Sequence, residues 1–255
     1  ATAGLLQVGN VAATAAGAGN VSLLSRDTAQ GNITLLAGGN VSATVNVDMN
    51  TTGNITGTAT SVVYASNNVT MAGGNITAPG NVTGGNVSMN ATAGLLSVGN
   101  VSASAGDVQL VASNNITSAA TGAITAANVS MNSTAGSINS NANITATGAV
   151  SLAAASGTIT TAAASKVVAT GNASYIAGSV NSNANLTAAN VVMNATTGAL
   201  SSANITAVSN GAISLTSKTA LSTTGTIAGG AISEKSTAGN VASGAVINAD
   251  RKSVV

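Results

Sequence analysis

Asn-x-Ser/Thr is the most frequent motif in this chain that could carry covalent chemistry. The 255-residue sequence contains nineteen such triplets, and each is an acceptor for N-linked glycosylation when it is exposed on a secreted protein. The same triplet also arises without a glycan where a corner asparagine precedes an inward aliphatic residue and an outward Ser or Thr. Both interpretations stay open. The preferred acceptors, which come just after a strand, are Asn90, Asn132 and Asn194, and the further candidates are Asn50, Asn20 and Asn172.

Catalytic chemistry has few residues to use. The chain lacks His and Cys, so the usual nucleophilic triads and zinc sites cannot be built. A glycosidase needs two carboxyl groups within about 5–10 Å of each other, and the carboxylates Asp48, Asp107, Glu234 and Asp250 are widely separated along the chain. The calcium-binding motif Gly-Gly-x-Gly-x-Asp is absent. We therefore expect no enzyme activity, no cofactor and no metal.

Composition excludes several other classes. Only 4% of residues are charged, the net charge is +1, and the six basic residues form no stripe, which argues against nucleic-acid binding. No run of about 18 apolar residues exists, so we expect no membrane insertion. The positive mean hydropathy of +0.42 and the low net charge argue against disorder. The apolar residues are nearly all small or aliphatic, which suits a thin core.

A short apolar–polar–apolar triplet returns about every 21 residues. The last residues of successive triplets are 22, 18, 21, 21, 21, 23, 18 and 22 positions apart. A fixed period in the range of about 20–50 residues indicates a repeat architecture. The triplets are 47–49, 69–71, 87–89, 108–110, 129–131, 150–152, 173–175, 191–193 and 213–215. Their last positions hold Met or Leu except for Tyr175, which we interpret as a core residue.

Two further aliphatic anchors separate successive triplets. Ile76 and Val82 follow Met71, for example, and Ile159 and Val168 follow Leu152. Each unit therefore offers three short strands in which alternate residues point inward. The pattern predicts an all-β chain, a right-handed parallel β-helix of about 12 coils of ~21 residues with three strands per coil.

The corners and the composition agree with this architecture. The dipeptide Gly-Asn precedes many strands, and both residues tolerate corner conformations. Coils stacked about 4.8 Å apart would let equivalent asparagines hydrogen-bond along the stack. Like charges repeated at that spacing repel, and proline removes a donor that the next coil needs, which explains why both are scarce.

Two places depart from the period. Val21-Ser22-Leu23 precedes the next triplet by about five residues too many, so we expect a protruding corner loop near residues 24–30. Ile232-Ser233-Glu234 puts a carboxyl group in the Met/Leu column. We therefore divide the chain into a shaft, residues 1–229, and an irregular C-terminal coil, cap or subunit joint, residues 230–255.

The first eleven residues, ATAGLLQVGNV, match ATAGLLSVGNV at 91–101, so the chain starts within a coil. Solenoid ends without caps recruit other chains. We therefore expect head-to-tail contact with a second copy, or continuation into a longer β-helix. The candidate residues for that joint are Ala1, Leu5, Leu6, Glu234, Lys235, Asp250, Arg251 and Lys252.

The stretch GNITLLAGGNV at 31–41 resembles the repeats of filamentous haemagglutinin-type exoproteins, which are secreted by the two-partner route and have long right-handed β-helix shafts. This resemblance implies an extracellular or cell-surface location and a fibre shaft or adhesin stalk.

Three functions remain at this level. The first expectation is a structural component of an extracellular filament, sheath or adhesin. The alternative is an adhesin that binds glycans or surfaces through its side face, although Tyr64 is the only aromatic residue outside the predicted core. An ice-binding solenoid is less favoured, because Thr-x-Thr, as in Thr145-Ala146-Thr147, does not recur in every coil.

Overall fold

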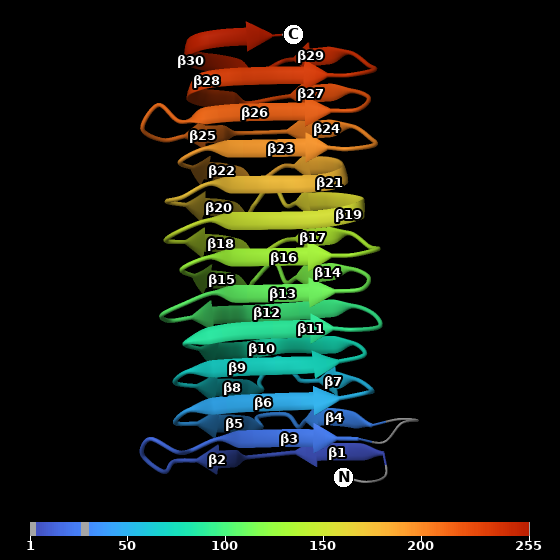
Figure 1. Ribbon diagram of the computed structural model, residues 1–255, viewed down its shortest axis with the longest axis vertical. Helices are drawn as coiled ribbons and strands as arrows, with labels where there is room; N and C mark the ends of the chain where they lie inside the picture. Colours follow the sequence, from blue (N-terminus) through green and yellow to red (C-terminus); the bar gives the residue numbers. More distant parts are fainter. Residues whose placement is uncertain (1–3, 27–30, 255) are drawn as a thin grey trace.

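The protein is a parallel β-solenoid, seen in a computed structural model that describes residues 4–26 and 31–254 (Figure 1). The described residues form strands and no helix, so they contain no helix that could cross a membrane. The strands are β1 (Leu5–Val8), β2 (Val11–Ala13), β3 (Val21–Ser25), β4 (Asn32–Leu35), β5 (Asn40–Ala43), β6 (Asn46–Thr51), β7 (Ile55–Thr56), β8 (Val62–Ala65), β9 (Asn68–Gly73), β10 (Ile76–Gly84), β11 (Asn86–Ala91), β12 (Leu96–Ala103), β13 (Val108–Ala112), β14 (Ile116–Ser118), β15 (Ala123–Ala126), β16 (Val129–Ser133), β17 (Ile138–Ser140), β18 (Asn143–Ala146), β19 (Val150–Thr161), β20 (Lys166–Ala169), β21 (Ala173–Ser182), β22 (Asn185–Ala188), β23 (Val191–Ala195), β24 (Leu200–Ser202), β25 (Ile205–Ala207), β26 (Ala212–Ser217), β27 (Leu221–Thr223), β28 (Thr226–Ser236), β29 (Val241–Ser243) and β30 (Val246–Val254).

The strands stack into three faces, and every strand pairing is parallel. Face A holds the sequence triplets and follows β3, β6, β9, β11, β13, β16, β19, β21, β23, β26, β28 and β30. Face B follows β1, β4, β7, β10, β12, β14, β17, β19, β21, β24, β27 and β29. Face C follows β2, β5, β8, β10, β12, β15, β18, β20, β22, β25, β28 and β30. Long strands such as β10 and β19 turn a corner and serve two faces.

The stacking confirms the predicted all-β solenoid. It makes about ten turns that have a neighbour on both sides, plus one terminal coil at each end, close to the expected number of about twelve. Figure 1 shows face A in front, with the two chain ends at opposite ends of the rod. The triplets align as predicted, because Met71 pairs with Met89 and Leu152 pairs with Tyr175 in the ladder.

The core is one column of small and aliphatic side chains that runs the length of the rod. The Met/Leu column is fully buried, and Tyr175 lies within it at 0% exposure, which confirms its assignment to the core. The predicted position of one inward anchor, Val168, was wrong by a single residue. Val167 is the buried residue, paired with Ile144, whereas Val168 points outward. Adjacent valines carry no alternation signal, so the strand phase at this position was ambiguous in the sequence.

The core also has a polar column that was not foreseen. It lies at the inward end of face B, where Ser118, Ser140, Thr161, Ser182, Ser202 and Thr223 are all at most 1% exposed. These residues stack on one another in successive coils. Buried hydroxyl groups need hydrogen-bond partners, so this column constrains the corner that it faces.

The segment from residue 230 onward continues the stack. Glu234 pairs with Leu215 on face A, and Ile247 pairs with Ile227 on face C. The last coil therefore has one strand segment on each of the three faces, as the coils before it do. The expected corner loop near 24–30 begins at the end of β3, and its residues 27–30 lie outside the described part of the chain.

Candidate functional site

Asparagine ladders line all three corners of the solenoid. In the corner that leads into face A, Asn46 donates its Nδ2 to Asn20 Oδ1 at 3.0 Å, and Asn68 repeats the bond to Asn46 at 3.0 Å. Asp107 continues this ladder by accepting from Asn128 Nδ2 at 2.9 Å. The predicted stacking of asparagine amides is confirmed. Further side-chain ladder bonds join Asn75 to Asn54, Asn100 to Asn81, Asn190 to Asn172 and Asn204 to Asn185. The backbone N–H of Asn54 donates to Asn32 Oδ1.

Glycine makes room for these ladders. A Cβ atom on Gly106 would overlap Asn86 Oδ1, and one on Gly94 would overlap Asn75 Oδ1. The Oδ1 atom of Asn86 instead accepts from the N–H of Asp107 at 3.0 Å. The corner residues of one coil are thus shaped by the asparagine of the coil before it, which explains why Gly and Asn recur together.

The candidate glycosylation sites fall into two structural groups. Asn50, Asn90 and Asn132 lie on face A in one outward column, with one intervening coil between neighbours, and Asn194 lies in the same column farther along the rod. The side-chain amides of these four residues make no hydrogen bond within the described chain. Asn20 and Asn172 instead belong to a corner ladder, where their Oδ1 atoms each accept a bond.

The described carboxylates do not form one site. Asp48 is exposed on face A, while Asp107 lies in the corner ladder three coils farther along. Glu234 is fully buried, and its Oε1 accepts from Thr223 Oγ1 at 3.0 Å while its Oε2 has no partner. Among the described residues, no three His, Cys, Asp or Glu side chains are close enough together to hold a metal ion.

The proposed joint residues are spread over the two ends. Leu5 is half exposed on β1, and Leu6 packs against the core. Lys235 is exposed, whereas Glu234 lies inside the rod beneath β30. Arg251 and Lys252 lie in β30, the last strand of the stack, together with Asp250. Ala1 lies outside the described residues.

Face C carries the surface features that sequence reasoning missed. Two shallow hollows of about 330 and 340 Å³ lie on it and share Ser102 and Thr125. Thr83, Ser102, Thr125 and Thr145 line these hollows and succeed one another coil by coil in one outward column. Tyr64 pairs with Thr83 and extends this column by one coil beyond the lining of the hollows. The coil lengths vary between 18 and 23 residues, so these positions show no fixed spacing in the sequence.

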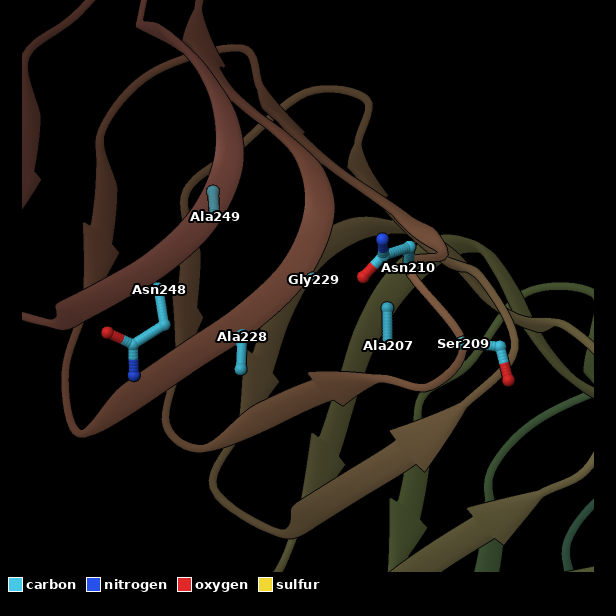
Figure 2. Close-up of a pocket in the computed structure, with 7 residues that line it drawn as sticks. All are labelled: Ala207, Ser209, Asn210, Ala228, Gly229, Asn248 and Ala249. Atoms are coloured by element: carbon cyan, nitrogen blue, oxygen red, sulfur yellow. The ribbon is translucent and has the colours of Figure 1, made fainter.

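A third hollow, of about 510 Å³, lies farther along face C. Figure 2 shows Asn248 and Asn210 at opposite sides of its lining, with Ala228 and Gly229 between them. The corner that carries Asn210 is unusual, because Ser209 and Asn210 both have left-handed φ values, 54° and 58°. Face C is therefore hollowed at more than one place along the rod.

The fold and these surfaces define a parallel β-solenoid repeat protein. No protein-family model, curated protein or solved structure matches the chain.

Proposed function

We propose that this protein is a structural component of an extracellular fibre: a β-helical shaft, or a subunit that polymerises head to tail, in a surface filament, sheath or adhesin. The observation that carries the proposal is the unbroken stacking of all three faces from the first described coil to the last. The resemblance of residues 31–41 to filamentous haemagglutinin-type repeats supports the same function and a cell-surface location.

The mechanical role follows from the bonds between coils. Each coil is joined to the next by parallel backbone ladders on three faces and by a continuous aliphatic core, and corner asparagine amides add bonds between many neighbouring coils. Such solenoids derive their stability from contacts between neighbouring repeats, so the stiffness of the rod does not depend on any single contact.

Self-association has a structural basis at the ends of the rod. Among the described strands, β1, β2 and β3 pair with one neighbour each, as do β29 and β30. A strand edge without a partner recruits further strands, and a contact between unlike ends extends into an open fibre. The partner is a second copy of this chain, or further coils of a longer β-helix.

Purified protein tests this proposal by sedimentation velocity and negative-stain electron microscopy over a concentration series. We expect rods whose length grows with concentration while their width stays that of one solenoid. The proposal fails if the particles are compact, or if rods associate only side by side.

N-linked glycans on face A are the covalent modification that we propose. The outward amides of Asn50, Asn90 and Asn132 repeat every second coil, about 9.6 Å apart, which separates neighbouring glycans. The Oδ1 atoms of Asn20 and Asn172 already accept hydrogen bonds, so we expect these two residues to be poorer sites for glycan attachment.

The intact mass of protein isolated from its native source tests this modification. We expect a mass above 23.8 kDa, with glycopeptides that map to the face A column. A mass equal to that of the bare chain would remove the proposal.

A further inference from the structure

We propose that the hollowed part of face C between Tyr64 and Thr147 is a binding site for a neutral, unbranched polysaccharide lying along the rod. This site is separate from the shaft function, because its polar residues point outward and make no part of the core. Four observations support it: the shape of the face, its lack of charge, its free hydrogen-bonding groups and its one exposed aromatic ring.

The shape suits an extended chain. The two hollows share Ser102 and Thr125, so they form one depression that crosses β10, β12, β15 and β18. From Tyr64 to Thr145 the outward column covers four coil steps of about 4.8 Å, roughly 19 Å in total. A ligand aligned with the rod would meet one equivalent side chain in every coil, as a polymer of identical sugars requires.

The chemistry of the depression selects uncharged ligands. Its lining consists of Asn, Ser, Thr, Ala and Val residues and contains no charged side chain. Nucleic acids and acidic polysaccharides are bound chiefly through Lys and Arg, and neither residue is present here. Amide and hydroxyl groups can instead donate to and accept from sugar hydroxyls.

Several of these polar groups are available to a ligand. Thr125 Oγ1 donates to Ser102 Oγ at 3.0 Å, which leaves the proton of Ser102 free to point outward. Asn81 Oδ1 accepts from Asn100 Nδ2 at 2.9 Å, while the Nδ2 group of Asn81 makes no bond within the described chain. The hydroxyl groups of Thr83 and Thr145 are likewise unused there.

Tyr64 supplies an apolar platform at one end of the column. Its side chain is 45% exposed, and it stacks directly on Thr83 in the ladder. Its hydroxyl group lies 3.4 Å from Ser66 Oγ, which ties the polar tip to the residue that follows its strand β8. An exposed tyrosine combines a flat apolar ring with a polar tip, and this combination suits the apolar face of a sugar ring.

Isothermal titration calorimetry on the full chain tests the site with defined hexasaccharides. The neutral probes are the β-1,4-linked hexamers of glucose, mannose and xylose, and the anionic probes are hexagalacturonate and a heparin hexasaccharide. We expect binding of at least one neutral hexamer and at least tenfold weaker binding of both anionic probes.

Matched variants locate the site. Tyr64→Ala and the double variant Thr83→Val with Thr145→Val should each weaken binding at least tenfold. Thr56→Val, the same change on the outward side of face B, should leave binding unchanged. Far-UV circular dichroism and rod length in negative stain check that each variant keeps its fold and its assembly.

The inference is overturned if no neutral hexasaccharide binds at millimolar concentration, if the anionic probes bind more tightly, or if Thr56→Val weakens binding as much as the face C variants. Because rod length is measured on the same samples, failure of the sugar site and failure of the shaft proposal give different results.

Discussion

The inward end of face B changes character halfway along the rod. In the N-terminal half this column holds Leu35, Ala78 and Val98, all buried aliphatic residues. From Ser118 onward it holds only Ser or Thr through Thr223, and these are buried as completely. Val98 pairs directly with Ser118, so the change occurs between two neighbouring coils of one ladder.

The difference follows from the corners between faces B and C. In the N-terminal half, β10 and β12 run through this corner with glycine at the turn. In the other half the chain turns through Asn141 and Ala142, whose N–H groups both donate to Ser118 Oγ at 3.0 Å. The corresponding corner near Ala184 donates to Thr161 Oγ1 at 3.1 Å. A hydroxyl in one coil thus satisfies the corner of the next.

The comparison shows that the buried hydroxyl groups of this column differ in whether the neighbouring corner gives them a hydrogen-bond partner. Ser118 and Thr161 accept from backbone N–H groups, whereas Ser140 and Ser202 have no partner for their hydroxyl groups. Leaving a buried donor or acceptor unpaired costs about 1–3 kcal/mol. Equivalent positions in one column therefore differ in what they contribute to stability.

The largest effect should separate two serines of that column. Ser118→Ala leaves the N–H groups of the buried Ala142 and the partly buried Asn141 without an acceptor, so we expect the free energy of unfolding to fall by about 1–3 kcal/mol. Ser140→Ala removes a hydroxyl that has no partner, so we expect no loss or a small gain. Urea denaturation of both variants checks this prediction. Equal losses in the free energy of unfolding would contradict the role assigned to these hydrogen bonds.

A smaller effect concerns Tyr175, the aromatic residue in the hydroxyl-containing half. Burial raises the pKa of its phenol, which is fully enclosed and has no hydrogen-bond partner. In the unfolded chain a tyrosine titrates near pH 10, so above that pH only the unfolded state releases this proton. Stability is therefore present below about pH 10 and falls by about 1.4 kcal/mol per pH unit above it.

Tyr175→Phe should remove that part of the alkaline loss and leave stability at pH 7 equal or slightly higher. Tyr64→Phe, at the exposed ring on face C, is the matched control and should behave as the parent chain does. Denaturation midpoints measured between pH 7 and pH 11 check the difference. Identical profiles for the parent and Tyr175→Phe would show that the phenol is not enclosed as described.

Much of the fold could be predicted from the sequence, because inward positions repeat every second residue within a strand and about every 21 residues from coil to coil. The triplets gave the register of face A, and anchors such as Ile76 and Leu200 gave that of face B. Val168 failed because two adjacent valines fit either phase. The sequence does contain a signal for the serine column, because a Ser or Thr stands two residues after each anchor from Ile116 to Leu221. Polar residues are normally assigned to the surface, so this signal does not by itself indicate burial.

The face C depression could not be predicted in the same way. Its column joins Tyr64, Thr83, Ser102, Thr125 and Thr145, whose separations vary because the intervening corners differ in length. A Thr-x-Thr motif places two threonines along one strand, whereas the face C column crosses from strand to strand. Only the register of the stacked coils places these residues in one line.

Electron cryomicroscopy of the assembled rods tests the central claim most directly, because it measures the spacing of coils along the axis. The account predicts a layer repeat of about 4.8 Å that continues without interruption from one chain into the next. Rods that always end after one chain length, or assemblies whose repeat of about 4.8 Å lies perpendicular to the long axis, would contradict it.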